Sequence, residues 1–257
     1  MMNYMRSEWY RITHTKDIYV FTGIMAAGVL LLNVGQYVCS AVIPDFRYSS
    51  VKFALSFLTG GMGALFLTGM ILAMVLFSAD QKNGIAKNAV AYGISREKLF
   101  IGKCIVSFAA ALISMMILLV LYIGTAVLLL EGPAQPYVGL LLEGVLCNLP
   151  AAAAFMILAV ALGQFFEKDS VAIVLWVAVY YFIPVATFML GLEIPALEKV
   201  AKWMPCYYLN FEVVAGMSGY DCLWSEPAGA ARCIIAGVIG IIVFLTAGIL
   251  MNRRKEL

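Results

Sequence analysis

The sequence predicts an all-α integral membrane protein with six transmembrane helices. Of its 257 residues, 63% are apolar and only 12% are charged, whereas soluble domains average about 45–50% apolar and about 25% charged residues. Six uncharged stretches each reach the length of about 20 residues that a helix needs to cross a bilayer. The basic residues of the connections lie mainly on one side of the implied topology. A soluble enzyme is therefore excluded, and lipid must surround most of the chain.

The predicted spans follow one another with short connections. They cover residues 18–44, 53–79, 104–130, 144–166, 170–192 and 233–252. The fourth helix is expected to begin earlier, near Pro136, and to carry Glu143 inside its outer end. The first apolar stretch is too long for a cleavable signal peptide and lacks a small-residue cleavage site, so it is expected to stay as a helix. The chain is thus expected to form a single transmembrane domain over residues 1–257.

The distribution of charge predicts that both termini are cytoplasmic. In this orientation twelve of the 17 Lys and Arg residues lie inside and five lie outside, as the positive-inside rule requires. An even number of spans also returns the basic C-terminus to the side of the basic N-terminus. The net charge of +2 is too small to indicate nucleic-acid binding.

Residues 1–17 are expected to form an amphipathic interfacial helix in the lipid headgroup layer. Met2, Met5, Trp9 and Ile12 recur at helical spacing on one side, and the basic residues lie off that side. Such a pattern is typical of a helix that lies on a membrane surface. The helix is expected to lead into the first span at an angle.

The cytoplasmic segment 80–98, between the second and third spans, combines basic residues with an apolar helical face. Ile85 and Tyr92 fall on one side of a short helix that Gly93 is placed to end, and Ser95 is placed to cap the next helix. One interpretation is a basic loop that only anchors the topology. The other is a short helix, held between two long helices, that a partner can push; the apolar face favours the second interpretation.

The extracytoplasmic segment 193–229 is too polar to span the membrane and too apolar to be a solvated loop. It contains several Pro and Gly residues beside Trp and Tyr side chains. Two short re-entrant helices folded onto the outer surface satisfy both properties, because Trp and Tyr settle at the membrane interface. Cys206 and Cys222 share this segment and could form a disulfide if it faces an oxidising compartment.

The sequence offers no residue set for catalysis or metal binding. The six cysteines have no C-x-x-C spacing, and His14 is the single histidine, so a zinc site has no ligands. The Gly102-Lys103 pair is followed by Cys104 instead of Ser or Thr, and Glu97 stands where a phosphate-binding loop begins with glycine. We therefore expect a chain that is not an enzyme and binds no cofactor itself, so that any ATP hydrolysis comes from another polypeptide.

Four polar residues toward the outer half of the spans form a candidate translocation path. Asn33 and Gln36 share one face of the first span, and Glu143 and Asn148 lie in the fourth. Ionisable groups in a bilayer often mark functional sites. Glu143 either reaches outer water from its place near a helix start or lines a path. Asn33 and Gln36 either line a path or form interhelical hydrogen bonds worth about 0.6 kcal/mol.

Two further features concern the packing of the spans. The small residues Gly60, Gly61, Gly63 and Ala64 predict close helix packing in the second span. Pro184 predicts a kink in the fifth span.

Taken together, these features resemble the membrane subunit of type 2 ATP-binding-cassette (ABC) exporters. The most specific part of the resemblance is the coupling segment FSADQKNGIAKNAVAYGISREKLFIGK. The N-terminal helix in YMRSEWYRITHTKDIYVF and the outer segment PALEKVAKWMPCYYLNF agree with the family by topology. The short basic N-terminus and compact loops resemble the permeases that expel antimicrobial peptides, such as lantibiotics or bacitracin, from the bacterial cell membrane.

The resemblance implies a mechanical role for the chain. Two copies of a separate ABC ATPase subunit, which hold ATP and Mg, would bind the coupling helix, at about residues 82–92, and rock two permeases between inward and outward states. The second permease would be identical or homologous to this chain. The residues expected to contact the ATPase are Ile85, Lys87, Asn88, Tyr92, Gly93, Arg96 and Glu97.

The alternative is an ATP-independent secondary transporter or membrane sensor that uses Glu143 as a proton-linked carboxylate. Secondary transporters usually contain internal repeats and broken helices with central charges, and the sequence shows neither pattern.

Overall fold

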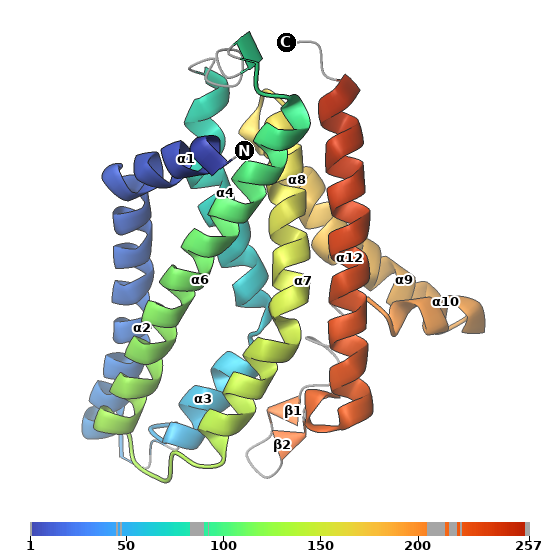
Figure 1. Cartoon of the computed structure of the whole chain (residues 1–257). Helices are drawn as coiled ribbons and strands as arrows, with labels where there is room; N and C mark the ends of the chain where they lie inside the picture. The colour runs from blue at the N-terminus through green and yellow to red at the C-terminus, as the bar shows by residue number, and fades with distance from the viewer. Residues whose placement is uncertain are drawn as a thin grey trace.

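The computed structural model describes residues 2–44, 46, 48–82, 90–91, 93–204, 214–215, 220–221 and 223–254. Over these residues the chain is almost entirely helical and forms one bundle (Figure 1). Five helices are long and apolar enough to cross a membrane, or six if the bent pair α3 and α4 counts as one span. The predicted class of helical membrane protein is therefore confirmed at this level.

The elements follow one another with short connections. The helices are α1 (Met2–His14), α2 (Asp17–Val42), α3 (Val51–Gly60), α4 (Gly63–Lys82), α6 (Arg96–Leu129), α7 (Tyr137–Phe165), α8 (Asp169–Val177), α9 (Ile183–Gly191), α10 (Pro195–Ala201) and α12 (Pro227–Arg254). A π-helical turn (Ala178–Phe182) joins α8 to α9, and a 3-10 turn (Leu223–Ser225) precedes α12. Two short strands, β1 (Val214–Ala215) and β2 (Tyr220–Asp221), pair antiparallel, with Val214 opposite Asp221.

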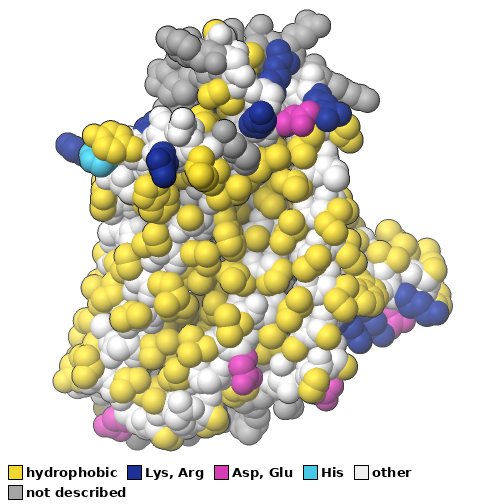
Figure 2. All heavy atoms as spheres, in the orientation of Figure 1, with side chains coloured by type: hydrophobic (Ala, Val, Ile, Leu, Met, Phe, Trp, Pro, Cys, Tyr) yellow, Lys and Arg dark blue, Asp and Glu magenta, His cyan; other side chains and the backbone are white. Residues whose placement is uncertain are grey.

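The two ends of the bundle differ in what they carry. At one end α1 lies across the bundle, and the last turn of α12 lies at the same end (Figure 1). At the opposite end lie α3 and the strands β1 and β2. Between these ends α2 runs beside α6, and α7 runs beside α12. The helices connect the two ends through a band of apolar surface (Figure 2).

The second predicted span, residues 53–79, is not one helix. It is divided into α3 and α4, whose axes differ in direction by 62°. The division falls at Gly60 and Gly61, and a pair of glycines is a common place for a helix to kink. Gly61 N donates to Phe57 O and ends α3. Of the small residues for which we predicted close packing, Gly63 shows it, because the Tyr180 hydroxyl occupies the space of a Cβ there.

Two spans are longer than their uncharged stretches predict. The third helix begins at Arg96 and the sixth at Pro227, so both include basic residues near their first turns. Such residues fit at a helix end because their side chains can extend toward water while their stems stay on apolar surface. The fourth helix begins at Tyr137, directly after Pro136, as expected.

The predicted kink at Pro184 takes the form of the π-helical turn that precedes it. A proline ring clashes with the carbonyl four residues earlier, here that of Tyr180, and offers no N–H to bond it. The chain accommodates this clash with a wider turn, in which Ile183 N donates to Ala178 O. The Tyr180 side chain is buried against Phe66 and Phe155, so the turn also contributes to the core.

An aromatic cluster forms the centre of the core where α4, α7, α8 and α12 meet. Phe155 contacts the rings of Phe66, Trp176 and Phe244 at centroid distances of 5.3, 5.7 and 5.8 Å. Trp176 is completely buried, and its Nε1 donates to Phe155 O at 2.8 Å. A buried indole N–H needs such a partner, so this bond fixes α8 against α7.

Glycines allow α12 to approach the rest of the bundle closely. A Cβ at Gly237 would lie 2.5 Å from Ala151 N, and one at Gly240 would lie 3.0 Å from Ala154 Cβ, both in α7. At Gly248 the ring of Phe100, in α6, fills the corresponding space. These contacts attach α12 along its length to α7 and α6.

The outer segment contains one of the two predicted short helices, α10. A Cβ at Gly191, the last residue of α9, would lie 2.8 Å from Glu198 N, so α10 folds back tightly against α9. Lys202 donates to Glu198 at 2.7 Å, and this hydrogen bond lowers the pKa of the Glu198 carboxyl. Residues 205–213, 216–219 and 222 of this segment, which include the predicted cysteine pair Cys206 and Cys222, lie outside the described residues, so the second predicted helix stays a prediction.

Candidate functional site

The predicted coupling segment is described only at its two edges. Ile85, Lys87, Asn88 and Tyr92 lie outside the described residues. Of the remaining three predicted contact residues, Gly93 precedes α6, and Arg96 and Glu97 lie in its first turn. The described elements that adjoin the segment are α1, the last turns of α4, the first turns of α6 and the last turn of α12, and together we call them the junction.

Gly93 follows the helical residues Val90 and Ala91. Its φ is +85°, in the left-handed region that glycine adopts without strain, and its N–H donates to Val90 O at 2.9 Å. Ser95 then occupies the N-cap position of α6 with extended backbone, although its side chain makes no capping hydrogen bond.

The first turns of α6 are attached to α12. Arg253 Nε donates to Glu97 Oε1 at 2.6 Å. Both side chains are substantially exposed, and exposed ion pairs contribute about 0–1 kcal/mol, so the pair fixes position more than stability. The buried ring of Phe100 packs on Gly248 of α12 and supplies the apolar part of the contact.

The same turns of α6 are covered by α1 on another side. A Cβ at Gly102 would lie 2.8 Å from Tyr4 Cε1, so the absence of a side chain at Gly102 lets the Tyr4 ring lie on the helix. Ile12, near the other end of α1, is 1% exposed. Met2 and Trp9 are exposed and are available to lipid. The helical conformation predicted for this segment is confirmed, and its place in the headgroup layer stays a prediction.

A buried charge cluster lies where α1, α4 and α6 meet. Glu8, 5% exposed, accepts hydrogen bonds from Arg11 Nε at 3.0 Å and Nη2 at 2.7 Å. Arg11 lies 5.5 Å from the centroid of the Phe77 ring, and Lys103 Nζ lies 4.7 Å from it. Lys103 is 2% exposed. Buried charges persist only when other groups compensate them, so Glu8, Arg11, Phe77 and Lys103 form one interdependent unit, which we call the charge cluster.

From the sequence, Lys103 was named only as part of a possible phosphate-binding loop, and Glu8 was not singled out. A signal for Lys103 was present, because it falls on the same helical stripe as Leu99, Val106 and Ala110, all of which are buried. A lysine on an apolar stripe at 3.6-residue periodicity indicates a buried cation. No comparable pattern marks Glu8, whose burial depends on the contact with α4 and α6.

The four residues of the predicted translocation path occupy different environments. Asn33 is completely buried between α2 and α6, and its Nδ2 donates to Tyr122 O at 2.9 Å and to Thr125 Oγ1 at 2.7 Å. Asn148 is also buried, and its Nδ2 donates to Gly144 O in its own helix. Glu143 lies on the exposed side of α7. The interhelical hydrogen bond expected of Asn33 is thus present.

Two buried acceptors on α2 have no hydrogen-bond partner among the described residues. They are Asn33 Oδ1 and Gln36 Oε1, which lie on the face that the sequence assigned to a path. The role of all four residues in translocation stays a prediction.

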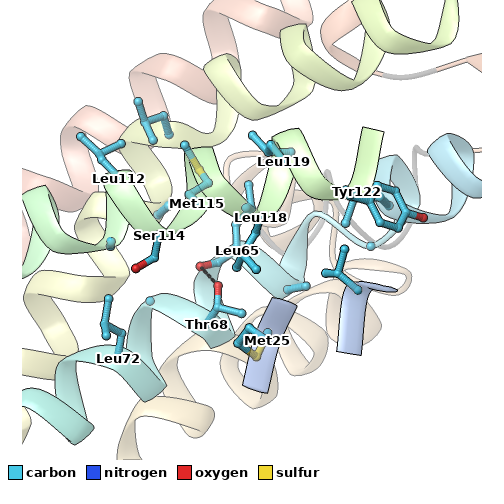
Figure 3. Close-up of a pocket in the computed structure, with 18 of the residues that line it drawn as sticks. Met25, Leu65, Thr68, Leu72, Leu112, Ser114, Met115, Leu118, Leu119 and Tyr122 are labelled. Atoms are coloured by element: carbon cyan, nitrogen blue, oxygen red, sulfur yellow. Dashed lines mark hydrogen bonds between the residues drawn. The ribbon is translucent and has the colours of Figure 1, made fainter. Parts of the chain in front are cut away.

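An apolar cavity of about 370 Å³ lies between α2, α3, α4, α6 and α7. Figure 3 shows part of its wall, with Met25, Leu65, Leu118 and Tyr122 around it. None of the four residues predicted for a path lines this cavity. The cavity could not be predicted from the sequence, because the pattern of apolar side chains at the centre of a span is the same whether they face lipid, protein or a cavity.

Comparison with known proteins adds no assignment. No protein-family model matches the sequence, and no curated protein matches it significantly. Among the described residues no group of three or more His, Cys, Asp or Glu side chains is placed to hold a metal ion. The fold and these sites define the class as a helical membrane protein.

Proposed function

We propose that this chain is the permease subunit of an ATP-driven ABC exporter that moves an antimicrobial peptide, or another amphipathic cargo, out of the bacterial membrane. The observation that carries the proposal is the attachment of the junction on both sides of the predicted coupling segment. The segment connects α4 to α6, so force applied to it acts on the adjoining ends of both helices.

The contacts at the junction support transmission of that force. The charge cluster joins the end of α4 to α1 and α6 through Phe77, Arg11 and Lys103. The start of α6 is joined to α12 through Glu97 and Arg253. A displacement of the segment would therefore move four elements together, as a mechanical coupling to an ATPase requires.

The chain would need two kinds of partner for this function. It lacks a phosphate-binding loop, so two copies of a separate ATPase subunit would supply ATP hydrolysis. A second permease, identical or homologous, would complete the pathway. In the apolar helices α2 and α12, only 11% and 17% of the apolar 18-residue stretch is buried. These helices therefore leave large surfaces for lipid and for such a partner.

Affinity purification from the native membrane tests the proposal. The full-length chain should co-purify with a protein that contains a phosphate-binding loop, and the double variant Ile85→Asp/Tyr92→Asp should lose that protein while it still inserts into the membrane. The matched control is Val200→Asp/Trp203→Asp, two exposed positions in the outer segment, which should keep the partner. Equal recovery of the ATPase with both double variants would refute the coupling role.

A further inference from the structure

The cavity lies midway along the long apolar helices that surround it. Its wall in α6 is formed by residues between Phe108 and Tyr122, in the middle of the 34-residue helix Arg96–Leu129. The walls in α2 and α7 come from the region of Phe21 to Leu32 and of Leu149 to Met156. The cavity is therefore surrounded by the middle parts of the helices, which hydrocarbon would cover in a bilayer.

Every polar side chain of the cavity wall already has a hydrogen-bond partner. The wall contains three hydroxyl groups and no charged residue. Thr68 Oγ1 donates to Leu65 O at 3.1 Å, Ser114 Oγ shares a hydrogen bond of 2.9 Å with Thr22 Oγ1, and Tyr122 Oη donates to Ala54 O at 2.6 Å. The wall thus offers an occupant apolar contact and little else.

The cavity has an exposed side and a buried side. Leu32 on α2 and Phe57 on α3 are 48% and 56% exposed, and both contribute to the wall. Leu72 and Leu119, also in the wall, are 1% and 8% exposed. The opening at Leu32 and Phe57 faces outward between membrane-spanning helices, which gives a lipid chain lateral access.

We infer that this cavity binds one acyl chain of a membrane phospholipid. Water is excluded as the occupant because it needs two to four polar partners, and the hydroxyl groups here are engaged. An extended peptide is excluded because its backbone amides would be buried without partners. The volume of about 370 Å³ lies at the small end of the range of about 300–1,000 Å³ for ligand pockets. This inference requires the membrane placement of the bundle and is independent of the proposed ATPase partner.

Photocrosslinking in lipid vesicles tests the inference. The full-length protein is reconstituted into phosphatidylethanolamine and phosphatidylglycerol vesicles that contain phosphatidylcholine with a diazirine in the middle of one acyl chain. After illumination, peptide mass spectrometry should find adducts on Met115, Leu118 or Phe108 of the cavity wall. A second sample, in which the diazirine is on the headgroup, should label none of these residues.

Two cavity-filling variants make the test specific. Ala111→Phe on α6 and Ala152→Leu on α7 each fill part of the cavity from a different wall. Adducts on the wall should fall roughly tenfold, since the loss of two buried methylenes changes affinity by about that factor. Ile113→Phe is the matched control, because Ile113 lies on the exposed side of α6 and should leave the adducts unchanged.

Three results would overturn the inference. One is the absence of adducts on the wall in the native protein when exposed residues of α12, such as Ile239, are labelled. Another is equal labelling of the wall by the headgroup probe. The third is unchanged labelling in both Ala111→Phe and Ala152→Leu, with size-exclusion profiles that show both variants to be folded.

Discussion

Asn33 illustrates how a polar residue is accommodated inside a membrane helix. Its amide nitrogen is satisfied by two acceptors in α6, whereas its oxygen has no partner among the described residues. The nitrogen therefore contributes to the packing of α2 on α6, and the oxygen remains available to a further donor.

The variant Asn33→Ala should destabilise the protein by about 1 kcal/mol, because interhelical hydrogen bonds in membranes average about 0.6 kcal/mol each. Unfolding in sodium dodecyl sulfate, followed by circular dichroism, measures the change. The neighbouring truncation Val34→Ala, at a position that is 41% exposed, should change the free energy of unfolding by less than about 0.5 kcal/mol. Equal effects of the two variants would mean that the Asn33 hydrogen bonds contribute nothing.

Glu8 is the anionic member of the charge cluster, and its substitution tests how much that cluster contributes to stability. Glu8→Gln keeps the shape of the side chain but leaves Arg11 without its anionic partner. Removal of one partner from a fully buried ion pair costs about 3–5 kcal/mol, and the Arg11 side chain is 29% exposed, so the loss of stability should fall below that range. We expect a clear drop in the unfolding temperature, measured by the reaction of a fluorogenic maleimide with buried cysteines such as Cys104 and Cys233.

Asp17→Asn provides the control for Glu8→Gln. It makes the same chemical change at an exposed position at the start of α2, and its unfolding temperature should match that of the native protein. If Asp17→Asn and Glu8→Gln unfold at the same temperature, the charge cluster does not stabilise the junction.

At the scale of single helices, the contact between α7 and α12 depends on residues without side chains. A Cβ at Gly237 meets backbone atoms of α7, which cannot rotate out of the way as a side chain can. Any larger residue must therefore separate the two helices.

The variant Gly237→Val should lower the free energy of unfolding by about 1–3 kcal/mol, the usual cost of overpacking. Detergent unfolding measures this loss. Gly35→Val on α2 is the matched control, because no atom lies within 4 Å of its added Cβ. A loss at Gly35→Val as large as that at Gly237→Val would assign the effect to the glycine backbone instead of the packing.

The sequence predicted helices well where long uncharged stretches define them and poorly where the backbone changes direction. The start of α7 after Pro136 and the irregular turn before Pro184 could both be predicted, because proline restricts the backbone locally. The break at Gly61 was not, since glycines in a membrane helix serve close packing as often as a bend. Only the position of Tyr180, far along the chain, shows that Gly63 packs and Gly61 does not.

The candidate sites follow the same division. The left-handed backbone conformation at Gly93 could be predicted from one residue. The burial of Glu8, in contrast, requires three helices to come together. The cavity likewise depends on how α2, α4 and α6 are spaced, and no local pattern records that spacing.

At the scale of the whole molecule, the orientation in the membrane is the main prediction that the fold leaves to experiment. Ser95 and Ser225 are both exposed. Ser95 directly precedes α6 and Ser225 lies just before α12, and these two helices begin at opposite ends of the bundle (Figure 1). In a variant without the native cysteines, Ser225→Cys should react with a membrane-impermeant maleimide on intact cells. Ser95→Cys should react only after the membrane is permeabilised.

The reverse labelling pattern would invert the topology and place the junction outside. Labelling of both positions on intact cells would contradict a bundle that spans the membrane in a single orientation. The denatured protein, in which both cysteines are accessible, provides the common reference for the extent of reaction.

The 62° angle between α3 and α4 has a consequence for how motion crosses the bilayer. A straight helix transmits a displacement of one end to its other end as a translation. Two helices that meet at a bend can convert such a displacement into a rotation about the bend. Movement at the end of α4 beside the junction would thus reach the opposite end of the bundle as a rotation of α3 about Gly61. Distances between spin labels on α3 and α4 measure that rotation directly.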